Sequence, residues 1–141
     1  MNPARPRVLI AGTPEALETL KALLSDEVDI VAARSVREAV GLLDSGVHLV
    51  ICSVRFDESR MFDFLHEVQR KSERGARVPV VCCRTHGDPF PPAAKRAIEL
   101  ALEALGVGSF VDLAQLRAEH GETAYVMFRA MVLAHLKQPP S

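Results

Sequence analysis

The chain has 141 residues, of which 48% are hydrophobic and 25% charged, a composition typical of a soluble globular protein. A formal net charge of -1 lacks the basic excess that nucleic-acid binding requires, so we expect no nucleic-acid partner. The first apolar run, residues 8–11, is too short for a signal peptide or a membrane span. We therefore expect a cytoplasmic protein without a membrane partner, with one domain over residues 1–137 and a polar tail or linker start over 138–141.

Short apolar runs alternate with amphipathic segments along the chain. Strands are expected at 7–12, 28–33, 48–54, 78–83 and 109–111. Helices are expected at 14–24, 36–45, 61–70, 93–105 and 122–137, with at most a short helical turn over 113–116. Thr13 and Ser35 are the expected N-caps of the first two helices, and Gly106 is expected to cap the fourth.

This alternation predicts an α/β fold with a doubly wound, five-stranded parallel sheet and helices on both faces. The strands are apolar without clean alternation, as a sheet buried on both faces requires. The expected architecture is flavodoxin-like, with strand order 2-1-3-4-5 and a long C-terminal helix.

The three cysteines do not indicate a disulfide framework, because their number is odd and Cys82 and Cys83 are adjacent. Cys52 is expected on a neighbouring strand. We interpret all three as small buried hydrophobic residues. A soft-metal or redox site that includes His86 is the less favoured alternative.

Several segments resemble the CheY-like receiver domain of bacterial response regulators. The apolar strand over 48–54, with Ser53 at its end, is similar to the family segment in which a strand ends in an Asp. The segment Val78-Pro79-Val80-Val81 resembles the family's fourth strand. Residues 106–111 resemble its Gly-Ala-x-x-Tyr-hydrophobic segment, and the similarity extends over residues 5–136.

The resemblance also implies where a working receiver would carry its phosphorylation chemistry. The Mg²⁺-binding acidic pair falls on Gly12 and Thr13, and the acceptor Asp falls on Ser53. The conserved hydroxyl falls on Arg84 and the lysine on Leu113. Mg²⁺ requires carboxylate oxygens, and without the metal the charge of the phosphoryl group is not neutralised. We therefore expect a degenerate pseudo-receiver that is not an enzyme and uses no cofactor.

Alternatives remain open at this pocket. Ser53 could accept phosphate, either through unusual receiver chemistry or from an external kinase, although filling space at a strand end is the simpler interpretation. Arg84 could occupy the vacant pocket and pair with Asp57 or Asp112, which would lock one conformation without phosphate. It could instead bind an anion there, which makes an anion-binding or small-molecule-binding regulatory domain around Ser53 and Arg84 the alternative function.

The last helix is apolar on more than one side, so it has two faces to bury. We expect one face to pack on the sheet and the other to bind a partner protein or a second copy of the chain. Residues 113–121 could instead fold over the second face. In the resembling family, the corresponding surface is the usual dimer and output face, and Phe110 matches its aromatic switch position. The expected interaction face comprises Phe110, Tyr125, Val126, Arg129 and Leu133.

Overall fold

The computed structural model describes residues 5–56, 60–73, 78–87, 89–106 and 108–137, the side chains of residues 72 and 73 excepted. Its centre is a parallel sheet in the order β2-β1-β3-β4-β5. The strands are β1 (Arg7–Ala11), β2 (Asp29–Ala33), β3 (Leu49–Ser53), β4 (Val80–Arg84) and β5 (Ser109–Asp112). The expected fold class and strand order are therefore confirmed, and each strand boundary lies within two residues of its predicted position.

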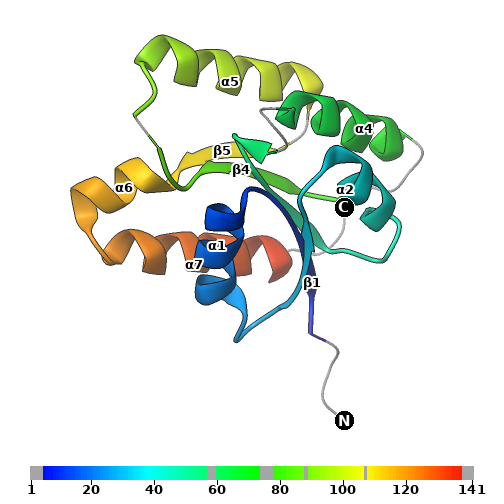
Figure 1. Ribbon diagram of the computed structural model, residues 1–141, viewed down its shortest axis with the longest axis horizontal. Coiled ribbons are helices and arrows are strands. Elements are labelled where there is room, and N and C mark those ends of the chain that lie inside the picture. The colour runs from blue at the N-terminus through cyan, green and yellow to red at the C-terminus, as the bar shows by residue number, and fades with distance from the viewer. Residues whose placement is uncertain (1–4, 57–59, 74–77, 88, 107, 138–141) are drawn as a thin grey trace.

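Helices cover both faces of the sheet (Figure 1). The helices α2 (Val36–Leu42), α4 (Met61–Glu73) and α5 (Pro92–Leu105) pack on one face. The helices α1 (Pro14–Leu24), α6 (Leu113–His120) and α7 (Thr123–Lys137) contribute to the hydrophobic core on the other. Of the helices in the described ranges, none combines the length and the hydropathy needed to cross a membrane.

Strand β3 shows why the apolar runs do not alternate with polar residues. All five of its residues are buried. Leu49 and Ile51 belong to the hydrophobic cluster beneath α1 and α7, whereas Val50 and Cys52 belong to the cluster beneath α2 and α4. Since successive side chains of a strand point to opposite faces, both sets must be apolar when both faces are covered.

The predicted helix starts are confirmed by their caps. The hydroxyl of Thr13 accepts a hydrogen bond from the backbone N–H of Ala16 at 3.3 Å, and that of Ser35 accepts one from Glu38 at 3.1 Å. At the end of α5, Gly106 adopts a left-handed conformation with φ of 67°, as expected for a C-cap glycine.

The segment after β5 differs from its prediction. Instead of a short turn over 113–116, residues Leu113–His120 form the complete helix α6. Asp112 caps this helix by accepting a hydrogen bond from the backbone N–H of Gln115 at 3.1 Å. The side chains of Gln115 and Glu119 are hydrogen-bonded one turn apart at 3.0 Å. Most of the outer positions of α6 are polar, so the sequence has too little apolar periodicity in this segment to predict the helix.

Candidate functional site

The carboxyl ends of β1, β3 and β4 meet at one edge of the sheet, where an open α/β fold places its functional site. A cavity of about 240 Å³ lies at this edge. Its lining residues are Thr13, Glu15, Ser53, Val54, Arg55, Thr85, His86 and Gly87. The structure thus brings Thr13 and Ser53, two of the five predicted pocket positions, to one cavity.

Gly12, which precedes the lining residue Thr13, is closely packed against Ser53 and Ala16. A Cβ atom at position 12 would lie 3.3 Å from the Cβ of Ser53 and 3.3 Å from that of Ala16. These separations are tighter than ordinary van der Waals contact, so a carboxylate side chain at position 12 would require its neighbours to move. The sequence carries no carboxylate at position 12, 13 or 53, and the local packing accommodates the glycine.

The residues that line the cavity carry polar groups of several kinds. Thr13, Ser53 and Thr85 contribute hydroxyl groups, Arg55 contributes a guanidinium and Glu15 a carboxylate. Ser53 is only 3% exposed, and its Oγ accepts a hydrogen bond from the backbone N–H of Arg55 at 3.4 Å. Among residues of the described ranges, no three His, Cys, Asp or Glu side chains are grouped so that they could hold a metal ion.

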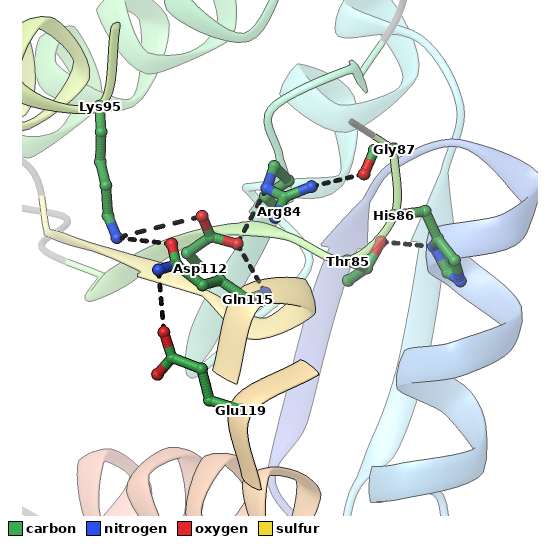
Figure 2. A network of polar contacts seen from close by, with 8 residues as sticks. All are labelled: Arg84, Thr85, His86, Gly87, Lys95, Asp112, Gln115 and Glu119. Carbon is green, nitrogen blue, oxygen red and sulfur yellow. Dashed lines mark hydrogen bonds and ion pairs between the residues drawn. The ribbon is translucent and has the colours of Figure 1, made fainter. Parts of the chain in front are cut away.

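Arg84, the last residue of β4, does not line this cavity. Its Nε donates a hydrogen bond to Asp112 Oδ1 at 2.9 Å, and its Nη1 donates one to the backbone carbonyl of Gly87 at 2.7 Å (Figure 2). The guanidinium also lies 5.6 Å from the ring centre of Phe90. Of the possibilities left open for Arg84, the structure shows the ion pair with Asp112 but does not place Arg84 among the residues that line the cavity beside Ser53. Asp57 lies outside the described residues.

The strand register explains this orientation. Arg84 and Asp112 are directly opposite each other in the β4–β5 ladder, so their side chains leave the sheet on the same face. Both side chains are buried, with 2% and 4% of their surfaces exposed. Removing two charges from water is costly, and this cost is offset only where the geometry is good and further hydrogen bonds are made.

Asp112 extends the ion pair into a wider network. Its Oδ1 accepts hydrogen bonds from both Arg84 and the backbone N–H of Gln115. Its Oδ2 lies 4.0 Å from Lys95 Nζ on α5, and it is buried without a hydrogen-bond partner among the described residues. The network therefore connects β4, the loop that follows it, α5, β5 and the first turn of α6 (Figure 2).

Leu113 is not a pocket residue either. It is the first residue of α6, is 1% exposed, and belongs to the core cluster with residues of α1 and α7. Its position in the sequence matches that of the family lysine, but its side chain leaves the sheet on the face opposite to Arg84 and Asp112. The assignment of Leu113 to the pocket is thus corrected to a structural role.

Glu15, Arg55 and His86 also line the cavity, although none of them was predicted as a polar group of this site. The imidazole of His86 lies 2.9 Å from Thr85 Oγ1 through Nδ1 and 3.3 Å from Thr19 Oγ1 through Nε2. It therefore links the loop after β4 to α1. The available signal was position, because Arg55 and His86 both follow directly after the carboxyl end of a central strand.

The three cysteines are free and fully buried. Cys82 and Cys83 face opposite core clusters, as alternation along β4 requires, and Cys52, which lies opposite Cys82 on β3, faces the same cluster as Cys82. Burial raises the pKa of the Cys83 thiol, and burial together with a hydrogen bond to Cys82 raises the pKa of Cys52. These thiols are therefore protonated at neutral pH, which makes them poor nucleophiles and poor metal ligands.

Helix α7 packs one face on the sheet and leaves another uncovered. Ala124, Phe128 and Val132 are buried, whereas Val126 and Met127 are 68% and 50% exposed. The face of α7 toward the core and its outer face are both apolar, as expected from the sequence.

The other predicted members of this face are only partly available. Tyr125 and Leu133 are half-buried against the core, and the guanidinium of Arg117 on α6 lies 5.1 Å from the ring centre of Tyr125. Arg129 pairs with Glu27 at 2.7 Å. Helix α6 thus shields part of the second face, as the alternative interpretation of 113–121 held, but leaves Val126 exposed.

Phe110 does not belong to the α7 face. It packs against the core cluster of α2, α4 and α5, whereas its neighbour Val111 packs against the cluster of α6 and α7. Successive residues of β5 face opposite sides of the sheet, so Phe110 lies on the side opposite to α7 and cannot form one surface with the α7 residues. The grouping of Phe110 with Tyr125 and Val126 is therefore corrected.

Comparison with solved structures identifies the class of fold. The chain is similar to the signal receiver domain of a putative Luxo repressor protein from Vibrio parahaemolyticus, at 21% identity and a TM-score of 0.66, over 94% of this chain and 91% of that one. It is similar to the non-phosphorylated HemR receiver domain from Leptospira biflexa, at 19% identity and a TM-score of 0.67, over 97% and 98%. No family model and no curated protein matches the sequence.

A third similar structure is the BeF3-activated N-terminal receiver domain of RstA from Klebsiella pneumoniae, at 17% identity and a TM-score of 0.65, over 95% of this chain and all of that one. The likeness extends over nearly the whole length of each chain. The protein therefore has the CheY-like receiver fold of response regulators, which confirms the resemblance seen in the sequence.

Proposed function

We propose that this protein is a signalling regulator that uses the receiver fold without phosphotransfer and acts through protein contacts made by α7. The observation that carries the proposal is the buried Arg84–Asp112 ion pair, with side chains 2% and 4% exposed, at the carboxyl edge of β4 and β5. Arg84 stands at the position where the resembling family has the hydroxyl that contacts the phosphoryl group, and its guanidinium is held by Asp112 on β5.

The chemistry of the cavity supports the same proposal. Phosphoryl transfer depends on neutralising the charge of the group in flight, which receivers do with a metal held by carboxylates. The three positions that would supply those carboxylates and the acceptor carry Gly12, Thr13 and Ser53. A serine nucleophile needs a general base to activate it. The imidazole that lines the same cavity, that of His86, is hydrogen-bonded to Thr85 and Thr19.

The first test is incubation with acetyl phosphate and Mg²⁺, followed by intact-protein mass spectrometry. We expect the mass to stay unchanged, under conditions in which a receiver domain that keeps its acceptor Asp gains one phosphoryl group. A stoichiometric phosphoryl adduct on the wild-type protein would contradict the proposal, and loss of the adduct in Ser53→Ala would then assign the acceptor to Ser53.

Anion binding in the cavity is the second candidate function. Three hydroxyl-bearing residues and Arg55 line the cavity near the N-terminus of α1, and donors of this kind favour a small anion such as inorganic phosphate. Arg84, which was the expected cation, has its own buried partner in Asp112. The carboxylate of Glu15, which also lines the cavity, opposes anion binding.

This candidate is tested by titrating inorganic phosphate while the thermal midpoint is measured. Anion binding predicts a midpoint that rises with phosphate concentration, because a ligand that binds only the folded state stabilises it by mass action. The rise should be lost in Arg55→Ala and kept in Arg37→Ala, a matched change at another exposed arginine, which lies on α2 on the other face of the sheet. An equal rise in both variants would identify a general salt effect instead.

A further inference from the structure

The outer face of α7 is ordered symmetrically about Ala130. At about 100° per residue, seven residues point within roughly 60° of the direction of Ala130. They are Thr123, Val126, Met127, Ala130, Leu133, Ala134 and Lys137. The apolar members lie three and four positions on either side of Ala130, and a polar residue lies seven positions away at each end.

This face is also where exposed apolar surface gathers. Three large hydrophobic side chains are strongly exposed in the described part of the chain, and two of them, Val126 and Met127, are adjacent on α7. Ala130 and Ala134 are exposed as well, and Leu133 is half-buried. No charged residue interrupts the surface between Thr123 and Lys137 within this sector. An uninterrupted apolar stripe of this kind is typical of a helix that packs against another helix.

We propose that a second copy of this chain covers the stripe, with the two α7 helices antiparallel around a two-fold axis at Ala130. This inference rests on the proposed role of α7 as the contact surface and names its partner. In an isologous pair, position 126 faces position 134 of the other copy, and position 127 faces position 133. Val126 therefore meets the small Ala134, Met127 meets Leu133, and Ala130 meets its own equivalent, where its small side chain permits close approach.

The charges at the ends of the helix favour the same direction. The exposed Glu122 precedes the first residue of α7, and the exposed Lys137 is its last residue. Antiparallel pairing brings Lys137 of one copy near Glu122 of the other. A parallel pair would instead place the two lysines together, and it would set Val126 against Val126 and Ala134 against Ala134, which leaves a gap at one end.

Disulfide cross-linking tests the geometry directly, because the three native cysteines are fully buried. Ala130→Cys should form a cross-linked dimer under mild oxidation. Val126→Cys alone should not, because its copies would lie about 12 Å apart along the paired helices. A mixture of Val126→Cys and Ala134→Cys should give a mixed dimer. Efficient self-linking of Val126→Cys, or none in Ala130→Cys, would overturn the proposed pairing.

Sedimentation over a range of concentrations gives the second readout. We expect a concentration-dependent dimer whose dissociation constant rises roughly tenfold or more in Ala130→Glu, because like charges then meet on the axis. Ala104→Glu, at an exposed position of α5, is the matched control and should leave the dimer intact. A wild-type protein that stays monomeric would overturn self-pairing without touching the proposed function, which fails instead if a phosphoryl adduct forms.

Discussion

At the scale of single residues, the carboxyl edge of the sheet is organised by one buried ion pair. Arg84 holds the loop after β4 through Gly87 and holds β5 through Asp112. Asp112 in turn caps α6. Two side chains therefore connect a loop, a strand and a helix at the carboxyl edge of the sheet.

Replacing Arg84 by Met should lower the free energy of unfolding by about 3–5 kcal/mol, because the carboxylate of Asp112 stays buried without its partner. Urea-induced unfolding monitored by circular dichroism measures this change. Adding Asp112→Asn to Arg84→Met should recover a large part of the loss, since the charge disappears and the oxygen that caps α6 remains.

The matched control for this prediction is Arg70→Met. Arg70 forms an exposed ion pair with Glu67 at 2.9 Å, and exposed pairs contribute at most about 1 kcal/mol. If Arg84→Met and Arg70→Met lower the free energy of unfolding by the same amount, Arg84 does not stabilise the carboxyl edge.

The sequence shows which residue types stand at this edge but not where their side chains go. Gly12, Thr13 and Ser53 could be placed from the strand pattern and the resemblance alone. Arg84 had three possible destinations, and the choice depends on its register opposite Asp112 across β4 and β5. That register is set by long-range strand pairing, which local sequence does not encode.

At the scale of elements, the segment after β5 is the part of the chain whose secondary structure differs most from the prediction. The polar helix α6 ends at Gly121, and α7 follows in a new direction after a short turn. Gly121 has φ of 63° and ψ of -141°, a conformation available almost only to glycine. The break between α6 and α7 thus depends on this single residue.

Gly121→Ala should lower the free energy of unfolding by about 1–3 kcal/mol, because a side chain is strained in this conformation. Gly41→Ala is a matched change with the opposite expected sign. Gly41 is exposed within α2 with nothing near its missing Cβ, so alanine there should stabilise the helix by about 0.5–1 kcal/mol. Thermal unfolding of the two variants measures both effects, and stabilisation by Gly121→Ala would show that the turn is not built as described.

The core helices and strands could be predicted because each carries an apolar pattern of its own. Helix α6 could not, since its stability comes from its Asp112 cap and from side-chain hydrogen bonds such as that between Gln115 and Glu119. The position of Phe110 relative to α7 was also missed. Successive side chains of β5 point to opposite faces of the sheet, so the assignment of β5 is enough to show that Phe110 and Val111 cannot both face α7.

At the scale of the whole molecule, the sheet order and the two helical layers follow from alternating strands and helices, and the similar receiver structures confirm them. What a shared fold could not give is the function of this chain, which carries Gly12, Thr13 and Ser53 at the predicted pocket positions. That function has to be argued from the buried network at the carboxyl edge and from the apolar outer face of α7.

The central claim is that the carboxyl edge holds one state without phosphate. Its most direct test is the amide NMR spectrum of the wild-type protein before and after addition of acetyl phosphate and Mg²⁺. We predict that signals from β5 and α5, including that of Phe110, stay unchanged, because Arg84 and Asp112 already fix this region. Shifts that extend from Ser53 to Phe110 and α5 would show a working phosphorylation switch and would contradict the account.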